Sequence, residues 1–128
     1  SQIGSVEFAA EQFGTRLVVV LGHSLCGAVI ATLNQLRQPT ELRSPHLRSI
    51  VDRVRPAVQP LLDTEVAEHP DRLVTEAVRA NIRAAAGQLR HGSMLLEELI
   101  ARDGLRVVGA EYSLESGTVT FFDGFPLD

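Results

Sequence analysis

The run of residues 16–21 (RLVVVL) constrains the fold of this chain more than any other segment. It is too short for a helix, and its consecutive valines favour an extended strand. A continuous apolar strand of this kind is typical of a parallel sheet whose two faces are both covered. The run therefore predicts an α/β fold that contains this strand, buried on both faces.

Apolar residues at helical spacing surround the strand. Ser5 and Ser44 can each cap the first turn of a helix. Gly14 and Gly104 are expected to stop helices, because glycine adopts left-handed backbone angles at low cost. Pro56 should end or kink its helix. The expected helices cover residues 5–14, 28–36, 44–56, 71–89 and 93–103, and the polar residues 63–70 are expected to form a loop.

The C-terminal part predicts two further strands. Residues 105–112 have a strand pattern, residues 114–117 turn the chain, and residues 118–122 return as the hairpin partner. The order of elements predicts a single three-layer α/β domain over residues 1–128. Its sheet should be mostly parallel, flanked by helices, with an antiparallel strand at the C-terminal end.

Composition excludes several functional classes. The formal net charge of -4 argues against a nucleic-acid partner, which would require a concentrated basic surface. No apolar run reaches the roughly 20 residues that a membrane-spanning helix needs. Cys26 is the only cysteine, so no disulfide can form within the chain, and this fits a reducing compartment. The default expectation is a soluble cytoplasmic domain.

The reactive side chains gather in one turn directly after the apolar run, residues 22–27 (GHSLCG). A turn between a strand and a helix lies at the carboxyl end of a sheet, where open α/β folds bind ligands. His23 and Cys26 are spaced so that an imidazole and a thiolate could reach one zinc ion. Cys26 would also lie at the N-terminus of the next helix, which favours the thiolate form. Because this spacing is common by chance, a structural role for both residues is the alternative.

Two other chemistries fit parts of the same turn. Gly22 and Ser24 match the start of a nucleophile elbow, G-x-S-x-G, as in serine hydrolases. Against this, Cys26 occupies the last glycine position, and no histidine follows His91 to act as the base. A phosphatase-type cysteine would need an arginine soon after it, and residues 27–32 contain none. A serine hydrolase that uses Ser24 stays as a minor alternative.

Four blocks, in order along the chain, resemble the β-class carbonic anhydrase family. Residues 4–9 (GSVEFA) and 22–28 (GHSLCGA) match its G-S-[IV]-E-[YF]-A helix and its G-H-[ST]-x-C-G-A turn. Residues 78–82 (VRANI) match its V-x-x-N-[VI] helix, and residues 105–122 are similar to its closing strand hairpin. The resemblance covers essentially the whole chain and implies the fold of that family.

The resemblance also implies roles for single residues. His23 and Cys26 fall on two of the family's three protein ligands to zinc, with Gly22, Ser24 and Gly27 completing the turn around them. In this family zinc lowers the pKa of a bound water, and the resulting hydroxide converts carbon dioxide to bicarbonate. Zinc is therefore the implied cofactor, and carbon dioxide and bicarbonate are the implied partners.

Other conspicuous residues are expected to serve the structure. Histidines outside the turn should lie at the surface or at helix ends, and Asn81 should be a buried hydrogen-bonding residue. Tyr112 and Phe122 should belong to the hairpin core. The histidines concerned are His46, His69 and His91.

One part of the family's site has no counterpart in these 128 residues. The family carries an upstream C-x-D-x-R segment, which supplies the other cysteine ligand and an aspartate–arginine pair. A catalytic zinc needs three protein ligands besides water. We therefore expect a β-carbonic-anhydrase-like fold truncated at its N-terminus, with weak or no zinc binding and little activity by itself. An intact protein that includes the segment is expected to be the enzyme.

Two further expectations concern context. The alternative to an enzyme is a non-catalytic carbonic-anhydrase-like binding or regulatory module, as in fusions to transporters, which would place it in a membrane-attached protein. The family pairs the strand at residues 16–21 with the absent first strand, so its open edge favours association with another chain. Family members are also dimers, and a homodimer or higher oligomer is expected.

Overall fold

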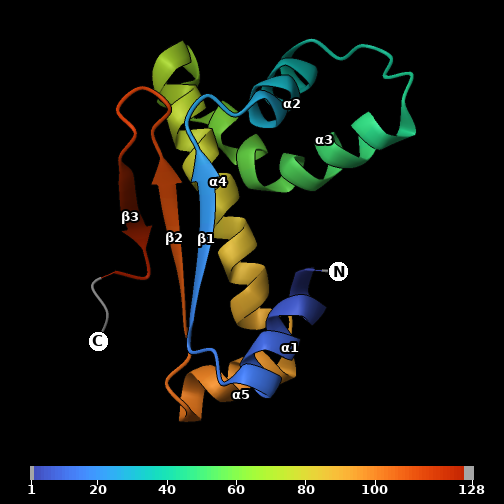
Figure 1. Ribbon diagram of the computed structural model, residues 1–128. Helices are drawn as coiled ribbons and strands as arrows, with labels where there is room; N and C mark the ends of the chain where they lie inside the picture. Colours follow the sequence, from blue (N-terminus) through green and yellow to red (C-terminus); the bar gives the residue numbers. More distant parts are fainter. Residues whose placement is uncertain (1, 126–128) are drawn as a thin grey trace.

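Residues 2–125 are described by a computed structural model, in which helices pack against a small mixed sheet (Figure 1). The order of elements agrees with the predicted α/β organisation. In chain order the elements are α1 (Gln2–Phe13), β1 (Leu17–His23), α2 (Gly27–Arg37), α3 (Pro45–Val58), the 3-10 helices η1 (Gln59–Asp63) and η2 (Glu65–Glu68), α4 (Pro70–His91), α5 (Met94–Arg102), β2 (Arg106–Tyr112) and β3 (Val119–Asp123).

The sheet has the strand order β1-β2-β3. β1 runs parallel to β2, in a register that pairs Gly22 with Glu111 and His23 with Tyr112. β3 runs antiparallel to β2, which confirms the predicted C-terminal hairpin. The turn between them uses Gly117 at φ +72°, a backbone angle that glycine adopts without strain.

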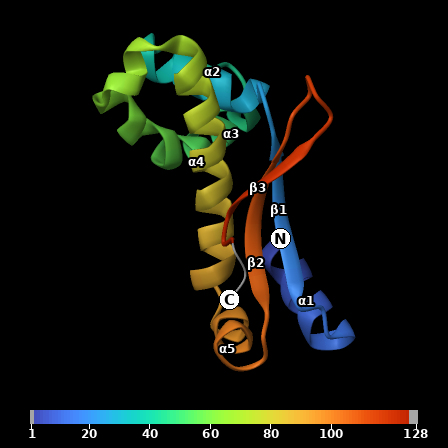
Figure 2. The same ribbon diagram turned by 90° about the vertical axis from the view of Figure 1, so that its left-hand side faces the viewer.

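The long helix α4 packs across one face of the sheet (Figure 2). Ile82, at its centre, lies against both Gly22 of β1 and Gly109 of β2. A Cβ added to Gly22 would lie 2.6 Å from Ile82 Cδ1, and one added to Gly109 would lie 3.1 Å from Ile82 Cγ2. The two glycines therefore allow α4 to approach the sheet closely at the end of β1.

Two apolar clusters form the core. The larger joins α2, α3 and α4 and includes Val29, Val54, Val58 and Ile82. The smaller joins α1, α5 and the residue just before β2 through Ala10, Leu96 and Leu105. In both views α1 and α5 lie at the end of the sheet where β1 begins (Figures 1 and 2).

β1 departs from the prediction of burial on both faces. Its side chains alternate, and those of Leu17, Val19 and Leu21 are 53%, 40% and 56% exposed. The alternation arises because α4 covers only the face that carries Val18 and Val20, and because β1 is an edge strand in residues 2–125. The apolar composition of β1 is typical of a strand buried on both faces, whereas in residues 2–125 only one face of β1 is packed against other elements.

Several helix ends also differ from expectation. α1 begins at Gln2, so Ser5 lies inside the helix instead of capping its first turn. Pro56 lies within α3, which continues to Val58 because that residue is fully buried in the core. The capping of α3 by Ser44 is confirmed, since its side chain accepts from the His46 and Leu47 amides. The predicted loop at residues 63–70 contains the short helix η2.

No helix within residues 2–125 has the length and apolar character required to cross a membrane.

Candidate metal centre

The turn after β1 is short and strained. β1 ends at His23 and α2 begins at Gly27, so few residues reverse the chain between them. Leu25 has φ +53°, and no other described residue except glycine has a positive φ. Left-handed backbone angles cost an L-residue about 1–2 kcal/mol. Such strain persists only where neighbouring contacts hold the backbone in place.

Ser24 supplies those contacts. Its amide donates to the Tyr112 carbonyl oxygen at 2.9 Å, which extends the pairing of β1 with β2 by one residue. Its Oγ accepts a hydrogen bond of 2.9 Å from the Leu114 amide, in the turn of the β2–β3 hairpin. The strained turn is therefore fastened to the hairpin through both the backbone and the side chain of Ser24.

His23 is exposed at the end of β1, and its ring is held by the backbone. Its Nδ1 lies 2.9 Å from the Ser24 carbonyl oxygen. A carbonyl oxygen can only accept, so Nδ1 carries the proton and Nε2 of the neutral ring keeps its lone pair. In metal-binding histidines, a hydrogen bond from the ring nitrogen that does not bind the metal usually fixes the orientation of the imidazole.

Cys26 occupies the N-cap position of α2 and is a partly exposed free thiol. Its side chain makes no capping hydrogen bond. The structure thus agrees with the predicted position of Cys26 at the start of the helix.

The donor set of this turn has the chemistry of a zinc site but is incomplete. An imidazole nitrogen and a thiolate sulfur are both preferred zinc ligands, and a catalytic zinc takes three protein ligands. No group of three or more histidine, cysteine, aspartate or glutamate side chains gathers anywhere in residues 2–125. His23 and Cys26 therefore offer, from one turn, two donors of the kinds that zinc prefers.

The two glycines of the turn differ. Gly22 is required by its contact with Ile82, which belongs to the VRANI block of α4. Gly27 has open space where a Cβ would lie, with no atom within 4 Å. Contacts within residues 2–125 therefore account for a glycine at position 22 but give no packing reason for a glycine at position 27.

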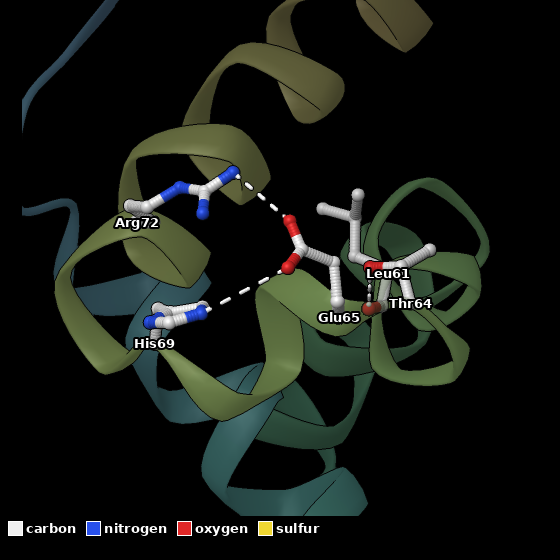
Figure 3. Close-up of polar contacts among 5 residues, drawn as sticks. All are labelled: Leu61, Thr64, Glu65, His69 and Arg72. Carbon is white, nitrogen blue, oxygen red and sulfur yellow. Dashed lines mark hydrogen bonds and ion pairs between the residues drawn. The ribbon is translucent and has the colours of Figure 1, made fainter.

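The remaining histidines lie at helix ends, as predicted. His46 is in the first turn of α3, and His91 is the last residue of α4. His69 precedes α4, where its Nε2 lies 4.0 Å from one carboxylate oxygen of Glu65, while Arg72 approaches the other oxygen at 3.5 Å (Figure 3). These groups are largely exposed, so their ion pairs contribute little to stability.

An ion pair beside the turn was missed by the sequence reasoning. Arg79 Nε on α4 donates to Glu111 Oε1 on β2 at 2.9 Å, and the Glu111 side chain is only 11% exposed. Arg79 and Arg83 also place their guanidinium groups over the Phe122 ring. The sequence feature that could have indicated this pair is Glu111, a carboxylate within an apolar strand, because a buried charge requires a partner.

Asn81 was predicted to form hydrogen bonds inside the core. It is half-buried and makes no side-chain hydrogen bond with the described residues.

Comparison with known proteins decides the family. A family model described as "Carbonic anhydrase" matches residues 1–119. The chain belongs to the carbonic anhydrase family. Among characterised carbonic anhydrases, carbonic anhydrase 2 of Mycobacterium tuberculosis is 32% identical over 123 residues, which are 94% of this chain and 56% of that protein. The carbonic anhydrase of Mycolicibacterium smegmatis is 34% identical over 117 residues, which are 91% of this chain and 54% of that protein.

Solved carbonic anhydrases share the fold. The β-carbonic anhydrase CafA of Aspergillus fumigatus has a TM-score of 0.79 at 24% identity, over 98% of this chain and 57% of that chain. A tetrameric β-carbonic anhydrase of Sordaria macrospora has a TM-score of 0.76 at 20% identity, over 94% of this chain and 59% of that chain. These likenesses confirm the predicted β-carbonic-anhydrase-like fold. The chain spans little more than half the length of the relatives it matches.

Proposed function

We propose that this carbonic anhydrase chain serves the zinc-dependent hydration of carbon dioxide to bicarbonate, with His23 and Cys26 as two of the zinc ligands. The observation that carries the proposal is the 2.9 Å hydrogen bond from His23 Nδ1 to the Ser24 carbonyl oxygen. It leaves the lone pair of Nε2 free on the turn that also presents the only cysteine of the chain.

Each residue of the turn has a distinct part in this proposal. When bound, zinc supplies a Lewis acid that activates water for attack on carbon dioxide. His23 offers Nε2 in a ring whose tautomer is fixed by the backbone. Cys26 offers its sulfur at the N-terminus of α2. Ser24 holds the turn on the hairpin, and Gly22 allows β1 to end close against α4.

The two ligands do not make a complete catalytic site. No third candidate joins them among the residues that the structure describes. We therefore expect residues 1–128 by themselves to hold well below one zinc per chain and to hydrate carbon dioxide poorly, until another segment or subunit supplies the third ligand. We also propose a dimer or larger assembly, since a similar solved structure is of tetrameric enzymes.

The test combines elemental analysis of zinc with stopped-flow hydration of carbon dioxide. It compares this chain with a version extended by the coding sequence upstream of Ser1. The extended protein should bind about one zinc per chain and be active. In that protein His23→Ala and Cys26→Ser should each lose most of the zinc and the activity, whereas His91→Ala, at an exposed helix end, should keep both. Full zinc occupancy in Cys26→Ser would refute the assignment.

A second candidate is a non-catalytic carbonic-anhydrase-like module for binding or regulation. It is favoured by the lack of a third candidate ligand in residues 2–125. If the extended protein also holds no zinc and shows no hydration of carbon dioxide, this second candidate replaces the first.

A further inference from the structure

The tip of the β2–β3 hairpin lies beside the turn that joins β1 to α2 (Figure 1). We call residues 113–118 the hairpin tip. The Leu114 amide, within the tip, donates to Ser24 Oγ at 2.9 Å. The Tyr112 carbonyl oxygen, just before the tip, accepts from the Ser24 amide at 2.9 Å. The hairpin therefore fixes both the amide and the hydroxyl oxygen of Ser24.

The carbonyl oxygen of Ser24 bonds to the proposed metal ligand, since it accepts from His23 Nδ1 at 2.9 Å. The direction of this carbonyl depends on the backbone angles of Ser24, which the two bonds to the hairpin restrict. In a neutral imidazole, the hydrogen bond at one nitrogen decides which nitrogen keeps its lone pair. The hairpin therefore acts, through Ser24, on the nitrogen that His23 offers.

Backbone strain in the turn opposes this arrangement. Leu25, directly after Ser24, has φ +53°, and an L-residue in this region is strained. The energy of such strain is of the same order as the contribution of one hydrogen bond. Loss of one bond between Ser24 and the hairpin is therefore enough to let the turn relax, and the Ser24 carbonyl then turns away from His23.

The hairpin tip is braced by its own polar groups. The Ser113 amide donates to the Thr118 carbonyl oxygen, and the Gly117 amide donates to the Ser113 carbonyl oxygen, each at 2.8 Å. The hydroxyl oxygens of Ser116 and Thr118 lie 2.7 Å apart. These bonds close the tip on itself, so the tip provides a fixed support for the strained turn.

We propose that the hairpin tip is a positioning element for His23. The Leu114 amide, acting through Ser24, holds the imidazole in its Nδ1–H tautomer and so raises the affinity of Nε2 for zinc. This inference rests on the proposed function, in which His23 is a zinc ligand. Loss of a hydrogen-bond partner of a metal-binding histidine weakens metal affinity about 10–100-fold. The Leu114 amide acts one bond further from the ring, so its loss should cost about tenfold, the lower end of that range.

Leu114 allows a change that is confined to one amide. It is the second residue of the turn that begins at Ser113, a position where proline is favoured, and its side chain is 56% exposed. Leu114→Pro therefore removes the N–H donor and keeps the turn. Leu114→Ala is the matched control, because it trims the same side chain and keeps the amide. Ser24→Ala removes the acceptor, and Ser24→Thr keeps a hydroxyl at the same position.

The first measurement uses the 128-residue chain without metal. Two-bond 1H–15N correlation spectra, recorded well above the ordinary imidazole pKa of about 6.5, show which ring nitrogen carries the proton. His23 should be Nδ1–H in the parent chain, in Leu114→Ala and in Ser24→Thr. Leu114→Pro and Ser24→Ala should both gain Nε2–H at His23, while the other three histidines keep their parent signals. Retention of Nδ1–H in Leu114→Pro would overturn the proposal, as would the same shift in Leu114→Ala.

The second measurement is the zinc affinity of the version extended upstream of Ser1, determined by competition with a chromophoric chelator. Leu114→Pro and Ser24→Ala should each bind zinc about tenfold more weakly, whereas Leu114→Ala and Ser24→Thr should match the parent. Unchanged affinity in Leu114→Pro would overturn the proposal. If the extended parent binds no zinc, the proposed function fails, and the tautomer of His23 then decides by itself whether the hairpin tip positions the ring.

Discussion

Gly22 and Gly27 border the same turn, but a methyl group would have different consequences at the two positions. At Gly22 the added Cβ would lie within 2.7 Å of two side-chain atoms of Ile82, which is buried in the core. Overpacking of this kind costs about 1–3 kcal/mol. We expect Gly22→Ala to lower the free energy of unfolding, measured by urea titration, by that amount. The control Gly27→Ala meets no atom within 4 Å and should leave stability close to that of the parent chain. Equal stability of the two variants would show that Ile82 moves aside freely.

Ser24 allows a separate test, because its hydroxyl is an acceptor for the Leu114 amide. Ser24→Ala should cost about 0.5–1.5 kcal/mol in urea unfolding, the usual contribution of one such hydrogen bond. It should not change the hydrolysis rate of p-nitrophenyl acetate, because among described residues no imidazole bonds to the hydroxyl. A large loss of esterase activity would instead support the serine hydrolase reading.

At the scale of elements, α4 and β2 are joined by one half-buried ion pair. Glu111→Gln removes the charge that neutralises Arg79 in a site with little exposure of the carboxylate. We expect a loss of about 1.5–3 kcal/mol in unfolding free energy, as for other hydrogen bonds to charged groups. Glu98→Gln is the matched control, because its pair with Arg102 is exposed and should contribute close to nothing. A double-mutant cycle with Arg79→Ala would separate the pair from other effects of either change.

Local signals along the chain predicted most elements. Ser44 caps α3, and Gly14 and Gly104 follow helix ends with positive φ, as the sequence indicates. These features depend on neighbours within a few residues, so a single sequence contains them. Pro56 does not end α3, which continues by two residues to Val58, a fully buried side chain.

The geometry of the site depended on contacts that local patterns do not contain. His23 and Cys26 were found from their residue types and spacing. The bond from the Leu114 amide to Ser24 joins residues 90 apart, and the Arg79–Glu111 pair joins residues 32 apart. Both arise only when β2 comes to lie beside β1 and α4.

At the scale of the whole molecule, the sheet face opposite α4 carries a broad apolar surface. The strand registers place Leu21 of β1 beside Ala110 of β2, and Ala110 beside Phe121 of β3. Leu21 and Phe121 are about half exposed and flank Ala110, which is fully buried, and Val119 and Tyr112 are exposed on the same face. Monomeric proteins rarely expose connected apolar surfaces of this kind, so this face is a candidate for contact between subunits.

We therefore expect Phe121→Thr to reduce self-association of the chain, measured by sedimentation velocity over a range of concentrations. Threonine keeps the strand preference of the position while removing an aromatic surface. Phe13→Gln removes a comparable exposed aromatic from α1 and should leave the association unchanged. Equal effects of both changes would mean that association depends on general hydrophobicity rather than on the sheet face.

The bond between Ser24 and the hairpin has a consequence for spectroscopy. The Leu114 amide donates to Ser24 Oγ, and the carbonyl oxygen of the same serine accepts from the His23 ring. The nitrogen resonance of the Leu114 amide is therefore coupled to the state of the His23 imidazole. An ion or inhibitor that reaches the ring would shift this resonance, although Leu114 is far from it along the chain. One labelled leucine thus gives a titration signal for occupancy that requires no turnover.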